Sequence, residues 1–132
     1  MSMVTIDRWT GMTVVDAQGE YLERFSTVHG ALEQLTCVAA ASLMVSEARI
    51  EVETEIGRLP IASFGDIVAT PAFVLEVPIR ALSGETIAYF SVRDTHPKPS
   101  SPFDVEVLSK LADSAQRKLM LAWSESGPQS VL

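Results

Sequence analysis

The chain has 132 residues, of which 47% are hydrophobic and 20% are charged, and its formal net charge is −7 at pH 7. This length predicts a single domain over residues 1–132, and the composition is that of a globular protein. The negative charge disfavours nucleic-acid binding, which needs clustered lysine and arginine side chains. The longest nearly uninterrupted apolar run, residues 37–45, is broken once by Ser42. It is much shorter than the roughly 20 residues of a membrane-spanning helix, so no membrane insertion is expected.

The N-terminal part of the chain contains a hairpin pattern followed by a helix pattern. Segments 12–16 and 20–25 are strand-like and flank a short loop that contains glycine. We therefore expect residues 1–27 to form an N-terminal hairpin extension. Apolar residues recur at helical spacing from about His29 to Ala41, which predicts a helix there.

The middle of the chain is less regular. Residues 42–46 indicate a buried strand, and residues 49–56 alternate between apolar and charged side chains. The alternation predicts a strand with Ile56 on the core side and the glutamates in water. Glycines and prolines interrupt residues 57–72, so this segment is predicted to be irregular, with room for a short helical turn over 61–68.

The second half of the chain has the clearest pattern. Residues 73–80 and 86–93 predict two strands joined by a Ser-Gly turn. A long amphipathic helix is then predicted from Pro102 to Trp123. Ser101 can cap this helix, with an acidic residue three positions later as in a capping box. We expect residues 124–132 to form a flexible tail.

The order of these elements, with the local sequences FVLEVPI and SGETIAYFSVRD and the capped final helix, resembles the GAF domain family of small sensory modules. The resemblance covers roughly residues 28–123. It implies an α+β fold with a central antiparallel sheet of about five to six strands. It also implies N- and C-terminal helices packed on one face and a ligand enclosed by loops on the other. The pocket segment, residues 57–72, is shorter than in typical members. A PAS-like or a roadblock-like sheet is the alternative fold.

The resemblance implies a non-catalytic signalling domain that binds a small molecule and transmits the signal through a helical homodimer. The alternative function is a pocketless protein-interaction or dimerisation module, and an enzyme is the third hypothesis. Four residues are candidates for ligand binding because they lie in or beside the pocket segment or end the neighbouring strand, namely Phe64, Asp66, Phe73 and Arg80.

The last turns of the final helix carry apolar residues beside its main stripe, and these are candidates for the dimer interface, namely Leu119, Met120 and Trp123. The two histidines, His29 and His96, are too far apart in the sequence to indicate a metal site. The single cysteine, Cys37, lies within a predicted helix and is expected to be a buried apolar residue. No metal, cofactor or covalently bound pigment is therefore expected. A lone cysteine also favours a cytoplasmic location.

Overall fold

The structure, a computed structural model, describes residues 28–99 and 101–126. The elements in this part of the chain are, in order, α2 (His29–Leu43), β1 (Glu47–Thr54), β2 (Gly57–Phe64), β3 (Phe73–Arg80), β4 (Thr86–Asp94) and α3 (Pro102–Ser126).

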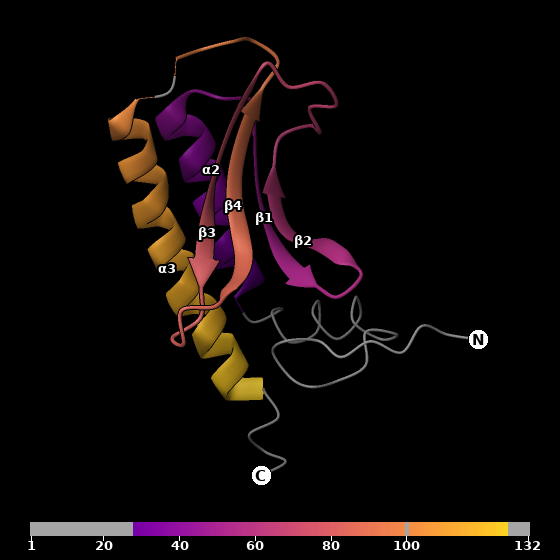
Figure 1. The fold of residues 1–132 in the computed structure, drawn as a ribbon, viewed down its shortest axis with the longest axis vertical. Coiled ribbons are helices and arrows are strands. Elements are labelled where there is room, and N and C mark those ends of the chain that lie inside the picture. The colour runs from indigo at the N-terminus through magenta and orange to yellow at the C-terminus, as the bar shows by residue number, and fades with distance from the viewer. Residues whose placement is uncertain (1–27, 100, 127–132) are drawn as a thin grey trace, which may run out of the picture.

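The four described strands form one sheet in the order β2-β1-β4-β3, and every neighbouring pair is antiparallel. The two helices lie on the same face of this sheet (Figure 1). Helix α2 packs mainly on β1 and β2, while α3 packs mainly on β3 and also contacts α2. The fold is therefore a two-layer α+β arrangement with one face of the sheet covered by helices.

The elements predicted in the second half of the chain are confirmed. Strands β3 and β4 occupy the predicted segments and pair with each other. The final helix begins where predicted but ends at Ser126 instead of Trp123. Its first turn is capped as expected, because the backbone N–H of Asp104 donates to Ser101 Oγ at 3.2 Å.

The prediction of a strand over residues 42–46 is wrong. Helix α2 continues to Leu43, and Met44 adopts a left-handed conformation with φ of 57°. The N–H of Val45 donates back to the carbonyl of Ala40 at 3.0 Å, which closes the helix. A short apolar run fits a helix end as well as a buried strand, so periodicity alone does not separate the two.

The segment predicted to be irregular contains a complete strand, β2, and the helical turn predicted over residues 61–68 is not formed. Pro60 is compatible with this strand because β2 lies at the sheet edge, where a missing N–H costs little. The pairing of β1 with β2 shifts register at this position, because Ile50 pairs with Ala62 and Glu51 with Pro60. The opposite edge strand, β3, also carries a proline, Pro78. Prolines at both edges oppose pairing with further strands.

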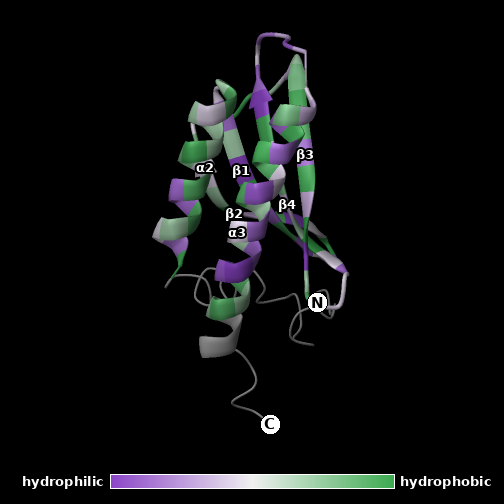
Figure 2. Ribbon diagram, turned by 90° about the vertical axis from the view of Figure 1, so that its left-hand side faces the viewer, coloured by the Kyte–Doolittle hydropathy of each residue, from purple (hydrophilic) through white to green (hydrophobic). Residues whose placement is uncertain are grey.

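The core lies between the sheet and the helices. Figure 2 shows hydrophobic and hydrophilic residues mixed along both helices, the pattern of an element with one buried face. The largest fully buried apolar side chains are Phe90, Leu32, Leu43, Ile50, Ile79, Leu108 and Leu119. Such side chains from both helices and three strands form one continuous cluster.

Three burial predictions are wrong. Cys37 is exposed, because it lies on the side of α2 that faces away from the sheet. Ile56 was expected in the core but is 63% exposed, because it lies in the turn between β1 and β2. Glu51 was expected in water but is only 8% exposed. Each error concerns contacts across the fold that local spacing does not encode.

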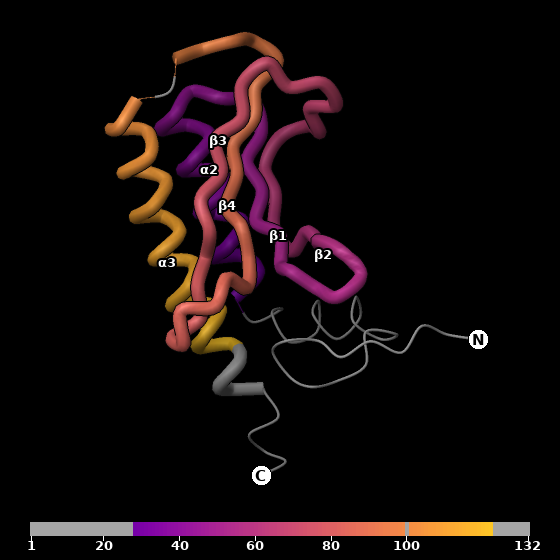
Figure 3. The backbone as a smooth tube through the Cα atoms, viewed as in Figure 1, coloured from indigo at the N-terminus to yellow at the C-terminus, as the bar shows by residue number. Residues whose placement is uncertain are grey.

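The described part of the chain contains four strands, fewer than the predicted five to six. The hairpin predicted within residues 1–27 and most of the predicted tail lie outside the described residues. Figure 3 shows that the β2–β3 connection lies at one end of the sheet and the β3–β4 turn at the other. Neither α2 nor α3 combines the length and apolar character that crossing a bilayer requires.

Candidate functional site

The sheet face that the helices leave uncovered carries polar and charged side chains. In β1 the core side chains include Ile50 and Val52, so the intervening residues point to the uncovered face. Across this face Arg49 of β1, Ser91 of β4 and Glu76 of β3 are register partners in one row. The uncovered face is therefore built from opposite charges around a central serine.

A buried carboxylate ties this face to the β2–β3 connection. Glu47 is only 2% exposed, and its Oε2 accepts hydrogen bonds from Arg49 Nε at 2.9 Å and lies 2.8 Å from Arg49 Nη2. Its second oxygen, Oε1, accepts from the backbone N–H of Val68 at 2.9 Å. Residues 65–72 thus lie over one end of the uncovered face, on the side away from the helices (Figure 1).

The start of this connection packs tightly against the end of the α2–β1 connection. Gly65 has a φ of +86°, and a Cβ atom at this position would overlap the carbonyl oxygen of Ser46. Only glycine fits both the positive φ and the close backbone approach. The path of residues 65–72 over the sheet therefore depends on this residue.

A second group of charges crosses the uncovered face. Arg58 of β2 donates to both carboxylate oxygens of Glu76 on β3, at 2.7 and 3.1 Å. Its guanidinium carbon lies 3.6 Å from the ring centroid of Tyr89 on β4, and one of its nitrogens lies 3.7 Å from Glu51 on β1. The hydrogen bond to Glu76 raises the pKa of Arg58 above its ordinary value, against the opposing effect of partial burial. One side chain therefore connects all four strands.

Two polar atoms on this face are buried without a hydrogen-bond partner among the described residues, Ser91 Oγ and Arg93 Nε. Ser91 is fully buried, and Arg93 is half-buried. Both belong to the central strand β4 and are two residues apart, so their side chains point to the same face. The great majority of buried polar groups in proteins have partners, so these two require an explanation.

The structure does not bring the four candidate ligand residues together. Phe64, Asp66 and Phe73 lie at the end of the sheet where β2 finishes and β3 begins, whereas Arg80 lies at the opposite end of β3. Phe73 is buried in the core cluster. Arg80 donates to Thr86 Oγ1 at 3.3 Å and is engaged in the β3–β4 turn.

The candidates for a dimer interface also differ in their surroundings. Leu119 is fully buried in the core, so its side chain offers no surface to a partner. Met120 is partly buried and packs against the same core. Trp123 lies in the last turns of α3.

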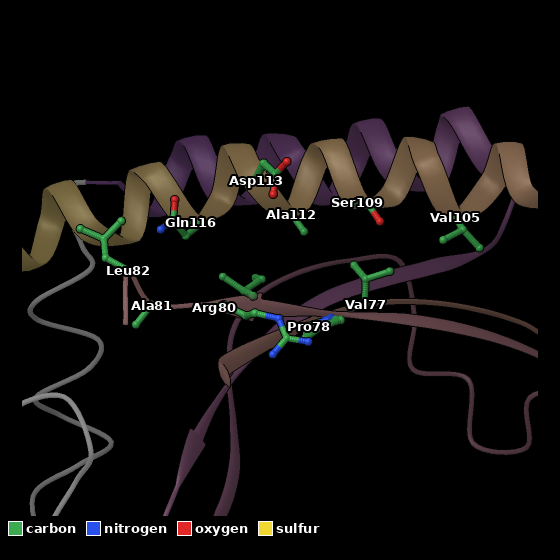
Figure 4. A pocket seen from close by; sticks show the side chains of 11 residues that line it. Val77, Pro78, Arg80, Ala81, Leu82, Val105, Ser109, Ala112, Asp113 and Gln116 are labelled. Atoms are coloured by element: carbon green, nitrogen blue, oxygen red, sulfur yellow. The ribbon is translucent and has the colours of Figure 1, made fainter. Parts of the chain in front are cut away.

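A cavity of about 580 Å³ lies between the edge strand β3 and helix α3. Figure 4 shows Ser109 and Ala112 of the helix on the side that faces the strand, where Val77 points toward the helix. Of the candidate ligand residues only Arg80 lines this cavity. Its residues are, in full, Val77, Pro78, Ile79, Arg80, Ala81, Leu82, Val105, Ser109, Ala112, Asp113 and Gln116.

The sequence prediction did not include Ser91, Arg93, Glu47 or Arg58. One signal was available, since Tyr89, Ser91 and Arg93 place polar atoms at alternate positions of an otherwise apolar strand. In an antiparallel sheet with one face packed on the core, polar residues at alternate positions of a strand mark the other face. This alternation therefore placed the polar atoms of β4 together on the face that the helices leave uncovered.

No model of a known protein family matches the sequence, and no curated protein is significantly similar to it. Several solved structures are similar in fold. The GAF domain of a phosphoenolpyruvate-protein phosphotransferase from Acinetobacter is 14% identical, with 82% of this chain and 96% of that domain covered and a TM-score of 0.63. The GAF domain of a putative sensor histidine kinase from Pseudomonas syringae pv. tomato is 17% identical, with coverages of 80% and 90% and a TM-score of 0.53.

The blue-light-absorbing form of the PixJ GAF domain from Thermosynechococcus elongatus is also similar. It is 8% identical, with 83% of this chain and 94% of that domain covered and a TM-score of 0.61. Identities this low establish the fold and leave the activity open. The four-stranded antiparallel sheet with both described helices on one face, together with these likenesses, shows that the chain has the fold of a GAF domain.

Proposed function

We propose that this chain is a non-catalytic sensory domain that binds a small molecule on the uncovered face of its sheet. Two of the proteins with a similar fold are a putative sensor histidine kinase and the cyanobacteriochrome receptor PixJ. Both belong to signal reception, which supports a regulatory role here. The proposed signal passes from the bound molecule through the sheet to the helices on the other face, and onward through a helical homodimer.

The observation that carries this proposal is a pair of buried polar atoms, Ser91 Oγ and Arg93 Nε, that have no hydrogen-bond partner among the residues that the structure describes. Leaving a polar group buried and unsatisfied costs roughly 1–3 kcal/mol. Departures from the rule that buried polar groups are paired concentrate at functional sites. A ligand that accepts hydrogen bonds from both atoms removes this cost, so the free energy of binding includes its recovery.

Residues 65–72 are the proposed responsive element. One link between these residues and the uncovered face is the hydrogen bond from Val68 N–H to Glu47, which also contacts Arg49. A ligand that alters the position of the Arg49 or Glu47 side chain changes this link. Residues 65–72 then shift relative to the sheet, so that binding at one side chain changes the position of a whole segment.

A thermal-shift and NMR screen tests the proposal. We expect at least one class among amino acids, organic acids, inorganic oxyanions and nucleotides to raise the melting temperature. The same compound must shift the backbone amide signals of Val68 and Ser91. If no compound perturbs these amides while the protein remains folded, a sensory site on this face is rejected.

The second candidate is a protein-interaction or dimerisation module without a ligand, and the surface of α3 favours it. Phe103, Val105 and Leu121 are 67%, 41% and 53% exposed, and apolar side chains on one helix are common at subunit contacts. Sedimentation velocity over a range of micromolar concentrations tests for a dimer. A Leu121→Glu variant is expected to weaken any dimer, with Lys110→Glu as the control for charge. A strict monomer at all concentrations rejects this candidate.

A further inference from the structure

We propose that the ligand of the uncovered sheet face is a small, singly charged carboxylate with a short apolar body, bound by Arg93 and Ser91. This inference rests on the proposed sensory function and specifies its ligand. It starts from the guanidinium of Arg93. Within the described part of the chain, Arg93 forms no ion pair, although its Nε is buried. A buried N–H in such a position is costly until an acceptor joins it.

The neighbouring carboxylate makes its contacts with donors other than Arg93. Glu47 is the register partner of Arg93 on β1. However, one oxygen of Glu47 contacts Arg49, and the other accepts from the N–H of Val68. Among the described residues, Arg93 Nε therefore has no acceptor, although a buried glutamate lies on the neighbouring strand. We assign the missing acceptor to the ligand.

Ser91 supplies a second donor at a suitable distance. Positions i and i+2 of a strand are separated by about 7 Å, since each residue advances the strand by roughly 3.3 Å. The long side chain of Arg93 can fold toward Ser91 Oγ across this gap. A carboxylate between them accepts a charge-assisted hydrogen bond of about 2.7–2.9 Å from the guanidinium. Its other oxygen accepts the hydroxyl proton of the serine.

The surrounding charges select a ligand of low charge. Four glutamates belong to β1 and β3 on this face, namely Glu47, Glu51, Glu53 and Glu76. The arginines on the same face are Arg49, Arg58 and Arg93. Because carboxylates outnumber guanidinium groups, a doubly charged anion such as phosphate meets stronger repulsion than a single carboxylate does.

An apolar side chain lies next to the proposed anion site. Val74 is the register partner of Arg93 on β3, and it is 49% exposed. It supplies a contact for the body of the ligand beside the carboxylate, since small-molecule sites combine apolar walls with a few polar groups. A branched short-chain acid such as 3-methylbutanoate therefore fits better than formate or nitrate.

The probes are 3-methylbutanoate, acetate, inorganic phosphate and the neutral isostere 3-methylbutanamide. Binding is followed by NMR titration of the backbone amides and of the side-chain Nε–H signal of Arg93. We expect 3-methylbutanoate to shift the Nε–H signal of Arg93 and to bind at least tenfold tighter than acetate, phosphate or the amide. Arg93→Gln is expected to weaken its binding at least tenfold, while Arg117→Gln, on the exposed side of α3, leaves it unchanged.

Ser91→Ala provides a test that does not depend on the folding of the arginine variant. Removing a buried hydroxyl without a partner is expected to leave the melting temperature of the free protein equal or higher. The same change is expected to weaken binding of 3-methylbutanoate severalfold. A lower melting temperature with unchanged binding would mean that the serine has only a structural role and would overturn the proposal.

The remaining outcomes distinguish a failure of this inference from a failure of the proposed sensory function. If phosphate or the amide binds as tightly as 3-methylbutanoate and shifts Val68 and Ser91, the face is a ligand site but the ligand class is wrong. If 3-methylbutanoate binds without shifting Arg93, the assignment of the anion site is wrong. If no probe, and no compound of the wider screen, perturbs this face, the inference and the proposed function fail together.

Discussion

Arg58 and Glu76 join the two edge strands of the sheet, β2 and β3, through two hydrogen bonds of 2.7 and 3.1 Å. Between them the guanidinium group lies over the ring of Tyr89 on the central strand β4. This bidentate pair spans the sheet on the face that lacks helices, so it stabilises the relative positions of strands that are not neighbours.

A double-mutant cycle with Arg58→Gln and Glu76→Gln measures this link. We expect a coupling of about 1 kcal/mol in the free energy of unfolding, at the upper end for partly exposed pairs because the geometry is bidentate. Chemical denaturation of the four proteins gives the value. The matched control is the exposed pair Glu106 and Lys110, whose atoms are 3.7 Å apart in α3 and whose coupling should be about 0.3 kcal/mol. Equal couplings for the two pairs would contradict the prediction.

Gly65→Ala is expected to destabilise the protein more than Gly84→Ala. Both glycines have positive φ, and this alone costs an alanine about 1–2 kcal/mol. Nothing lies within 4 Å of a Cβ atom at Gly84, whereas at Gly65 the added atom would overlap the carbonyl oxygen of Ser46. The difference between the two variants should exceed about 1 kcal/mol in urea denaturation. Equal losses would show that the connection accommodates the methyl group.

Cys37 is expected to react with a thiol reagent in the folded protein almost as fast as in the denatured protein, because its side chain is exposed. Cys37→Ser should change the free energy of unfolding by less than about 0.5 kcal/mol, as is usual for surface positions. The control is Cys37→Ser combined with Ala39→Cys, since Ala39 is fully buried. That thiol should be protected until the protein unfolds. Slow labelling of Cys37 would place it in an interface.

Asp94 gives a prediction about acid stability. The backbone N–H of His96 donates to its Oδ1 at 3.1 Å, and this hydrogen bond lowers the pKa of Asp94 from its ordinary value of 3.8. A lowered folded-state pKa adds stability above the unfolded-state pKa, and this stability is lost as the pH falls through the folded-state value. Asp94→Asn should therefore be less stable than the wild type at neutral pH, with the difference shrinking toward low pH.

Denaturation of both proteins across the acid range measures this effect. His96→Ala serves as the control, because it removes the ring but keeps the backbone N–H that is the main cause of the shift. It should retain most of the pH dependence of the wild type. A difference between Asp94→Asn and the wild type that is constant with pH would contradict the assigned cause.

Local sequence signals were sufficient for β3, β4 and the start of α3. Alternation of apolar residues fixes which face of a strand is buried, and Ser101 caps the helix through an oxygen only three residues from its partner Asp104. These features depend on neighbours in the chain. The order of such elements was also enough to indicate the GAF fold that the solved structures support.

Strand β2 was missed because Pro60 argues against a strand until its edge position is known, and that position depends on the order of the strands. Glu51 was assigned to water because the alternation shows Arg49 on the same face but gives no sign of Arg58 from the neighbouring strand. The exposure of Cys37 depends on which side of α2 packs against the sheet, and the local sequence did not reveal this.

The candidate site also combines features that the local sequence determines with features that only the tertiary structure determines. By itself the sequence determined which segments are strands and helices in the second half of the chain, because backbone preference and alternation act over a few residues. Only the tertiary structure decided that Glu47 contacts Arg49 and Val68 while, in the part of the chain that the structure describes, Ser91 Oγ and Arg93 Nε have no hydrogen-bond partner. The burial and pairing of charged side chains depend on strands that are neighbours in the sheet but distant in the sequence. A local sequence pattern therefore does not predict which charged side chains will be in contact.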